Sequence, residues 1–163
     1  MRCSKPGWTR SKEMRVSDRQ TVALIACAAS KGSVPAAARA LYQSPLFQMS
    51  LDYAERVENA RAYVLSAEHG LVSADAVLAP YDRTLNAMPL ADVRRWASGV
   101  VRQLREVTDP GGDRFVVLAG ERYRRFVVPS LDNVSVPMEG LGIGRQLQWL
   151  RRSLAQPRDR ETT

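Results

Sequence analysis

Two kinds of apolar pattern alternate along this chain of 163 residues. Some apolar runs are short and continuous, as in strands that are covered on both faces of a sheet. Others place an apolar residue every three or four positions, which is typical of a helix with one buried face. The expected strands cover residues 22–26, 62–65, 115–118 and 134–136, and the expected helices cover residues 44–58, 90–107, 120–128 and 143–154.

Several local signals support these helices. Ser44 is a good N-cap, and Pro45 suits the first turn that follows it. In the helix over 90–107 we expect one buried stripe, formed by Val93, Trp96, Ala97, Val100, Val101 and Leu104. In the last helix we expect Leu147, Leu150 and Leu154 to face inward. Residues 66–88 are expected to be irregular, because they show no clear period and Pro80 interrupts them.

Alternation of strands and helices favours an α/β fold with a parallel sheet. We predict a three-layer sandwich with a short, mostly parallel central sheet of about four strands, joined by right-handed crossovers. Residues 1–19 are expected to form a flexible basic arm, residues 20–155 a single α/β domain, and residues 156–163 a disordered tail.

Composition adds a location and a class of partner. The apolar run over 22–29 is too short for a membrane helix, and we interpret it as a buried strand rather than a secretion signal. Two cysteines are too few for a disulfide framework, so a cytoplasmic protein is expected. The net charge of +7 suggests a polyanionic partner.

The distribution of charge weakens that suggestion. Residues 1–19 hold six basic residues against two acidic ones (+4), and residues 151–163 hold four against two (+2). The rest of the chain therefore carries only +1. Two solvated basic ends explain the total as well as a nucleic-acid partner does.

The turns after the expected strands hold the candidate functional residues. Ligands of open parallel sheets bind outside the carboxyl ends of the strands, so these turns should converge on one pocket. The first turn offers Cys27, Ser30 and Lys31; the second Ser66, Glu68 and His69; the third Gly120, Arg122 and Tyr123; and the fourth Glu139. Each also has a plain structural interpretation, such as a turn cap, a packed thiol or a solvated cation.

Acid–base chemistry is suggested by Glu68 beside His69, the only histidine of the chain. Tyr81 and Asp82 lie in the long irregular stretch, where Tyr81 could stack on a base and Asp82 could act as a site carboxylate. Arginines beside Tyr123 suit phosphate contacts.

Glycines 140, 142 and 144 match neither a dinucleotide nor a Walker spacing, so they are interpreted mainly as a turn into the last helix. No zinc site is expected from one histidine and two distant cysteines. A magnesium site built from Glu68, Asp82 and Glu139 has no further support. We therefore predict no metal and no cofactor.

Five blocks of the chain resemble a widespread prokaryotic and phage family of uncharacterised domains over about residues 20–152. They are Ala-Cys-Ala-Ala-Ser-Lys (26–31), Ala-Arg-Ala-Leu-Tyr-Gln-Ser-Pro-Leu-Phe (38–47), Leu-Ser-Ala-Glu-His-Gly-Leu (65–71), Pro-Tyr-Asp-Arg-Thr-Leu (80–85) and Pro-Met-Glu-Gly-Leu-Gly-Ile-Gly-Arg-Gln-Leu (137–147). That family is similar to the uracil-DNA glycosylase superfamily and to domains that accompany tRNA-guanine transglycosylases. Small members resemble anti-phage enzymes that excise modified bases.

The resemblance implies a DNA glycosylase of uracil-DNA-glycosylase-like fold that flips and excises a modified base, with phage DNA as one source. The glycosylase water-activating motif and the His-Pro-Ser motif are both absent, so roles are not copied directly. The expected catalytic residues are Asp82, Glu68, His69 and Lys31, with Lys31 also able to act as a Schiff-base nucleophile. The expected substrate-binding residues are Cys27, Ser30, Tyr42, Ser44, Ser66, Tyr81, Arg83, Gly120, Arg122, Tyr123 and Glu139.

Two alternatives stay open. One is a non-catalytic nucleic-acid-binding module, and the other is an enzyme that processes nucleotides or nucleosides. No membrane and no obligate protein partner are expected. The base and the choice between DNA and RNA are not fixed by these residues.

Overall fold

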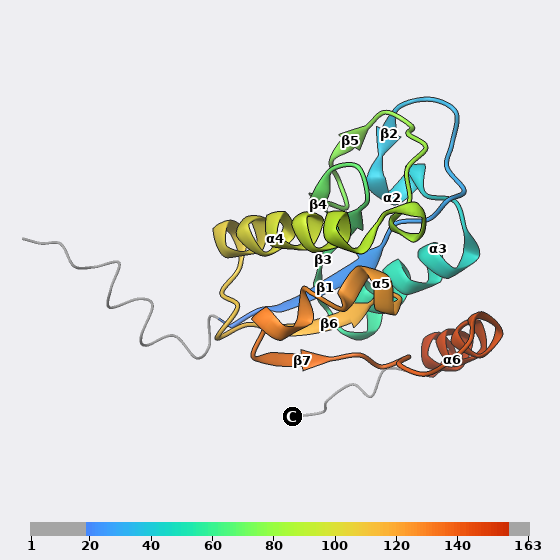
Figure 1. Ribbon diagram of the computed structural model, residues 1–163. Helices are drawn as coiled ribbons and strands as arrows, with labels where there is room; N and C mark the ends of the chain where they lie inside the picture. Colours follow the sequence, from blue (N-terminus) through green and yellow to red (C-terminus); the bar gives the residue numbers. More distant parts are fainter. Residues whose placement is uncertain (1–18, 157–163) are drawn as a thin grey trace, which may run out of the picture.

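A five-stranded sheet forms the centre of the molecule (Figure 1). The computed structural model describes residues 19–156. Four strands are parallel and β4 is antiparallel to β3. In sheet order the strands are β4 (Gly70–Ser73), β3 (Arg61–Ser66), β1 (Thr21–Ala26), β6 (Arg114–Leu118) and β7 (Asn133–Ser135).

Helices cover both faces of this sheet (Figure 1). One face packs against α4 (Leu90–Val107) and α5 (Glu121–Arg124). The other packs against α2 (Ala38–Leu41), α3 (Pro45–Asp52) and α6 (Ile143–Ala155). The remaining elements are the π-helix η2 (Tyr53–Val57), the 3-10 helices η3 (Leu85–Ala87) and η4 (Val128–Ser130), and a small antiparallel pair, β2 (Ala36–Ala37) with β5 (Val77–Leu78).

Strand β1 is apolar throughout because both of its faces are buried. Val22 and Leu24 belong to the core under α4, whereas Ala23 and Ile25 belong to the core under α3 and α6. All four are at most 1% exposed. The three-layer α/β sandwich that the alternating pattern predicts is thus present.

Several predicted elements are confirmed. The long helix runs from Leu90 to Val107, as predicted, and five of its six expected stripe residues are buried. Ser44 caps α3, since its Oγ accepts a hydrogen bond from the backbone N–H of Phe47 at 3.0 Å. The last helix begins at Ile143, although only Leu150 of its three inward-facing leucines is fully buried.

Three predictions need correction. The sheet has five strands rather than about four, because β4 adds an antiparallel edge. Residues 66–88 are not irregular throughout, since they hold β4, β5 and η3. Helix α5 ends at Arg124 rather than near residue 128. The predicted arm and tail lie almost wholly outside the described residues.

The carboxyl ends of three neighbouring strands finish at the same level. Ala26 of β1 is in register with Leu65 of β3, and Ile25 is in register with Leu118 of β6. The chain passes from β1 to β3 on one side and later returns to β6 on the other, which makes this edge a topological switch point. Among the described residues, no helix has both the length and the apolar character needed to cross a membrane.

Candidate functional site

Two tyrosines and a serine form a hydrogen-bonded chain at the carboxyl edge of the sheet. The hydroxyl of Tyr81 lies 2.6 Å from that of Tyr42 and 2.9 Å from Oγ of Ser66. Ser66 Oγ also accepts the backbone N–H groups of Glu68 (3.2 Å) and His69 (3.0 Å). Both of its lone pairs are then occupied, so the Ser66 hydroxyl donates its proton to Tyr81. Burial raises the pKa of both Tyr42 and Tyr81, which keeps these phenols neutral.

Lys31 extends over this aromatic pair. Its Nζ lies 4.4 Å from the ring centroid of Tyr81 and 5.8 Å from that of Tyr42, within reach of a cation–π interaction. A β-bridge between Lys31 and Tyr42 holds the lysine backbone in place. The ring of His69 meets Tyr81 edge-on at 5.5 Å between centroids. We call Lys31, Tyr42, Ser66, His69 and Tyr81 the tyrosine cluster.

The turn after β3 explains why its residue types occur where they do. Ser66 closes the turn through the two backbone N–H groups that it accepts. Gly70 has φ of +76°, a conformation that favours glycine. Trp96 of α4 donates its indole N–H to the Ser66 carbonyl at 2.8 Å. These contacts give the Ser-Ala-x-x-Gly-Leu block a structural role beside any functional one.

The two predicted catalytic carboxylates are exposed side chains that neighbour cluster residues in the sequence. Glu68 is paired with Arg83 at 3.5 Å, and both side chains are substantially exposed. Asp82 is exposed and makes no hydrogen bond or ion pair within residues 19–156. Both carboxylates adjoin the cluster in sequence, Glu68 next to His69 and Asp82 next to Tyr81, and they remain accessible to a substrate.

Cys27 and Tyr123 join the end of β1 to α5 at the switch point. The Cys27 thiol donates to the Tyr123 hydroxyl at 3.5 Å, and the backbone N–H of Leu85 donates to the same oxygen at 3.4 Å. Burial, followed by the neighbouring Cys27, raises the pKa of Tyr123 to about 12. Tyr123 therefore stays protonated at neutral pH.

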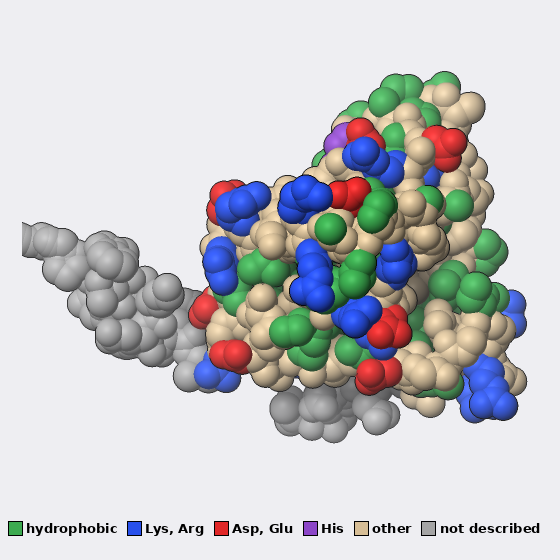
Figure 2. All heavy atoms as spheres, in the orientation of Figure 1, with side chains coloured by type: hydrophobic (Ala, Val, Ile, Leu, Met, Phe, Trp, Pro, Cys, Tyr) green, Lys and Arg blue, Asp and Glu red, His purple; other side chains and the backbone are tan. Residues whose placement is uncertain are grey.

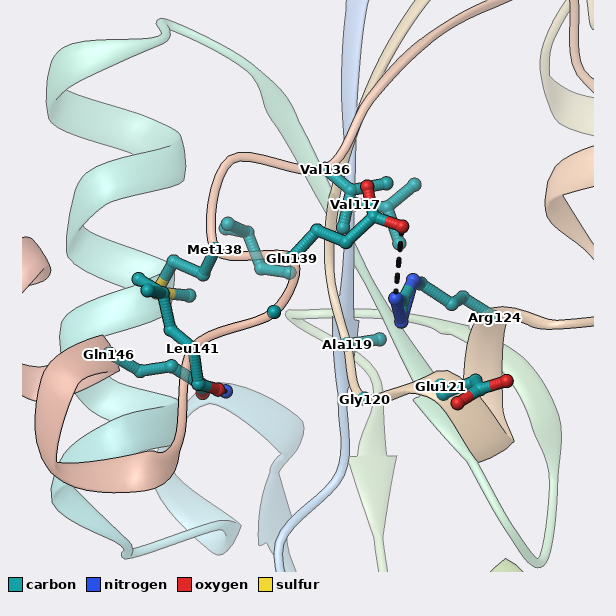
Figure 3. Close-up of a pocket in the computed structure, with 12 residues that line it drawn as sticks. Val117, Ala119, Gly120, Glu121, Arg124, Val136, Met138, Glu139, Leu141 and Gln146 are labelled. Atoms are coloured by element: carbon teal, nitrogen blue, oxygen red, sulfur yellow. Dashed lines mark hydrogen bonds and ion pairs between the residues drawn. The ribbon is translucent and has the colours of Figure 1, made fainter.

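A cavity of about 310 Å³ opens beside this junction, at the carboxyl ends of β6 and β7 (Figure 3). Arg124 of α5 and Glu139 of the loop after β7 point toward one another there, 3.5 Å apart. The lining consists of Val117, Leu118, Ala119, Gly120, Glu121, Arg124, Val136, Met138, Glu139, Gly140, Leu141 and Gln146.

The predicted site residues thus divide into two groups. Lys31, His69 and Tyr81 lie together, as expected, whereas Gly120 and Glu139 line the cavity. Because Lys31, Glu68, His69 and Asp82 are not among the lining residues, this cavity does not supply the single shared pocket that we expected.

Four predicted substrate-binding residues have structural tasks in the described chain. Tyr42 is fully buried, so its ring has no free face for a base. Ser44 caps α3. Arg122 donates to the backbone carbonyls of Leu85 (2.7 Å) and Met88, so its guanidinium is occupied by the protein. Ser66 Oγ accepts two backbone N–H groups of the turn that follows β3.

Ser30 is exposed and its carbonyl accepts the backbone N–H of Gln43 at 2.8 Å. Of the three arginines around Tyr123 (Arg122, Arg124 and Arg125), only Arg122 was expected to bind substrate, whereas Arg124 is the one that lines the cavity. A helical offset of two residues turns their side chains to different sides of α5, and the strand order needed to choose between them is not a local signal. Within residues 19–156, no three His, Cys, Asp or Glu side chains are grouped to hold a metal ion.

Fold and site together define an α/β protein with a polar site at the carboxyl edge of a mostly parallel sheet. The chain belongs to a family of unknown function (DUF6884), whose model matches residues 22–152. Comparison with curated proteins and with solved structures gave no match.

Proposed function

We propose that this protein is a DNA glycosylase that removes a modified base by hydrolysing its N-glycosidic bond. The observation that carries the proposal is the tyrosine cluster, in which Lys31 and His69 flank Tyr81 at the carboxyl edge of the sheet. In this reaction a water oxygen bonds to the sugar C1′, and the C1′–N bond breaks. The bonding electrons leave with the base, and the proton of water passes to a carboxylate.

The charges around the cluster suit both halves of this reaction. C–N cleavage develops positive charge on the sugar, which Glu68 or Asp82 would stabilise while orienting water. Negative charge develops on the leaving base, which Lys31 or His69 would stabilise. Tyr81 is half-buried and remains a candidate platform for stacking, unlike the enclosed Tyr42.

The finer features of the proposal rest on the resemblance described above. They are the likeness to the uracil-DNA glycosylase fold, the modified base, an anti-phage role and a cytoplasmic location. Support from the fold is limited to a mostly parallel sheet covered by helices on both faces, with its polar groups at the carboxyl edge.

The first prediction tests catalysis directly. The purified protein is incubated with duplex and single-stranded DNA that carries normal or hypermodified bases, and alkali-labile abasic sites and released free base are measured. Glu68→Gln or Asp82→Asn should lower turnover by at least ~10² while DNA binding is retained. Glu106→Gln is the matched control, because Glu106 is an exposed carboxylate near the far end of α4.

Full activity in both variants would exclude the carboxylate assignment. Sodium borohydride separates the two chemical routes, since a Lys31 Schiff base would be trapped as a protein–DNA adduct and direct hydrolysis would not. Turnover of free nucleosides, with indifference to DNA, would instead indicate a nucleoside-processing enzyme.

A non-catalytic nucleic-acid-binding module is the second candidate. Figure 2 shows basic side chains spread over the face formed by α4 and α5. There the guanidinium groups of Arg94 and Arg125 both lie over the ring of Phe126, at 4.5 and 5.1 Å from its centroid. Two cations on one aromatic surface suit a phosphate backbone. This candidate predicts salt-dependent binding and no abasic product.

A further inference from the structure

The cavity at the carboxyl ends of β6 and β7 has the size of a site for one small planar group. Its volume of about 310 Å³ is at the lower end of ligand pockets. Apolar side chains from two segments line it, namely Val117 of β6, and Val136, Met138 and Leu141 of the stretch between β7 and α6. Four polar side chains line it as well, namely Glu121, Arg124, Glu139 and Gln146 (Figure 3). The surface that the cavity presents is more polar than apolar, which suits a group recognised through its hydrogen-bonding edge.

Arg124 is the most unusual group in the cavity. Its side chain is only 15% exposed, yet its one partner among the described residues is Glu139 at 3.5 Å. That distance is longer than a charge-assisted hydrogen bond, which spans about 2.7–2.9 Å. A guanidinium has five N–H donors, so Arg124 keeps donors free for a ligand in a partly desolvated place.

Glu139 supplies the complementary chemistry. Its side chain is 68% exposed, so it can move toward a ligand at little cost. An ionised carboxylate only accepts hydrogen bonds, whereas a guanidinium only donates them. A ligand that contacts both must therefore present acceptors to Arg124 and a neighbouring donor to Glu139. Inorganic phosphate offers acceptors to Arg124, but the negative charge of Glu139 would repel it.

We propose that this cavity binds a nucleobase whose edge presents two adjacent acceptors followed by a donor. Guanine has this order in N7, O6 and N1–H, and cytosine has it in O2, N3 and the exocyclic amine. The two acceptors match the guanidinium fork, as in Arg recognition of guanine. Uracil and adenine alternate acceptors and donors along their edges, so the fork meets only one acceptor.

This inference deepens the proposed function, on which it rests, by assigning the excised base to the guanine or cytosine class. Neighbouring strands lie about 4.8 Å apart, so about two strand spacings separate the cavity from the tyrosine cluster over β1 and β3. Cys27 and Tyr123, in contact at 3.5 Å, lie at the junction between them. The proposed function requires that a nucleoside with its base edge on Arg124 turn its sugar toward β1, which would bring C1′ toward Lys31.

The test measures base binding in the absence of catalysis. Guanosine, cytidine, uridine, adenosine and inorganic phosphate are titrated separately into the full-length protein. The methyl resonance of Met138, which lines the cavity, is followed by NMR. Guanosine and cytidine should shift this resonance saturably, and at least about tenfold more tightly than uridine or adenosine. Arg124→Met should abolish this preference, with affinity lowered at least about tenfold.

Arg124→Lys is a second variant that keeps the charge and removes the fork, and it should lose the discrimination while staying folded. Arg105→Met is the matched control, since Arg105 is exposed near the end of α4 and does not line this cavity. Equal binding of all four nucleosides, tighter binding of phosphate, or an unchanged Arg124→Met variant would overturn the inference. If abasic product forms but no nucleoside binds in the cavity, this inference is overturned and the proposed function stands. If nucleosides bind in the cavity but no abasic product forms, only the proposed function is overturned.

Discussion

Tyr81 and Tyr63 differ in what their hydroxyl groups contact. The Tyr81 hydroxyl makes two hydrogen bonds, to Tyr42 and Ser66, and Lys31 lies over its ring. The hydroxyl of Tyr63 is buried and, within the described chain, has no hydrogen-bond partner. An unsatisfied buried hydroxyl costs free energy, whereas a satisfied one contributes modestly. Replacing each tyrosine by phenylalanine therefore removes a hydrogen-bonded hydroxyl in one case and an unpaired hydroxyl in the other.

Removing these hydroxyls should change stability in opposite directions. Tyr81→Phe should lower the free energy of unfolding by ~1–3 kcal/mol, since two hydrogen bonds are lost. Tyr63→Phe should leave it unchanged or raise it by up to ~1 kcal/mol, because an unpaired group is removed. Urea unfolding followed by circular dichroism measures both. Equal destabilisation by the two variants would show that the tyrosine cluster is not held as described.

The buried phenols also make stability depend on alkaline pH. The folded-state pKa of Tyr123, about 12, lies above its unfolded value of 10.0, because burial disfavours the phenolate. The unfolded chain therefore loses this proton first as pH rises. Stability from Tyr123 is fully present below about pH 10 and is lost as pH rises toward 12, by an amount on the order of 2 kcal/mol.

Urea unfolding at about pH 8 and about pH 11 checks this sign. The wild-type protein should lose more stability between these values than Tyr123→Phe does. Tyr42 and Tyr81 act in the same direction, since burial raises both of their pKa values. An identical decline in the wild type and the Tyr123→Phe variant would contradict the assigned cause.

At the scale of elements, the turn into β4 depends on one glycine. Gly70 has φ of +76°, and a Cβ added there would lie 2.4 Å from Oε1 of Gln103. That glutamine pairs with the backbone of Leu71, accepting its N–H at 2.8 Å and donating to its carbonyl at 3.2 Å. A side chain at position 70 would therefore disturb both the turn and the contact of β4 with α4.

Gly70→Ala should lower the free energy of unfolding by at least ~1–2 kcal/mol through left-handed strain and the clash. Gly144→Ala is the matched control, because this position lies in the first turn of α6 with open space around its Cα. There alanine should stabilise the helix by up to ~1 kcal/mol. Thermal unfolding measures both, and a neutral Gly70→Ala would contradict the turn geometry.

How well each element could be predicted depended on its length and on the source of its stability. Helix α4 was predicted to the residue, because eighteen residues repeat one buried stripe between Pro89 and a polar end. Strands β4 and β5 are four and two residues long, so they give no readable period. They exist because β3 and β2 pair with them, which is tertiary information.

Most site residues could be predicted only where a strand end could be predicted beside them. Lys31 and His69 were placed in the site because each follows a predicted strand end, and Tyr81 because it lies in the long irregular stretch; the three do lie together. The hydrogen bond between Tyr42 and Tyr81 spans 39 positions and could not be inferred locally. Glu139 was expected beside Lys31, yet it follows β7, the edge strand, and its partner is Arg124 of α5.

At the scale of the whole molecule, most of the net positive charge lies at the two ends of the sequence. Residues 1–18 contain five basic residues, Arg2, Lys5, Arg10, Lys12 and Arg15, against two acidic ones. If the protein binds DNA through phosphate contacts, these cations contribute to affinity without reading sequence.

Changing those five residues to glutamine in the full chain should weaken duplex DNA binding. The slope of log K against log salt should become shallower, by up to about 0.9 for each contact removed. Fluorescence anisotropy at several salt concentrations measures this slope. Arg102→Gln on the exposed side of α4 serves as a single-charge comparison. An unchanged slope would mean that the first eighteen residues do not contact DNA.

The hydrogen bond from Trp96 to the Ser66 carbonyl also gives the molecule an internal optical reporter. The same indole meets Tyr123 edge-on at 5.8 Å, so it adjoins both the tyrosine cluster and the junction at Cys27. Trp149 packs against Tyr53 on the opposite face of the sheet and senses other surroundings. Occupancy of the carboxyl edge can therefore be followed through indole emission, without attaching a dye.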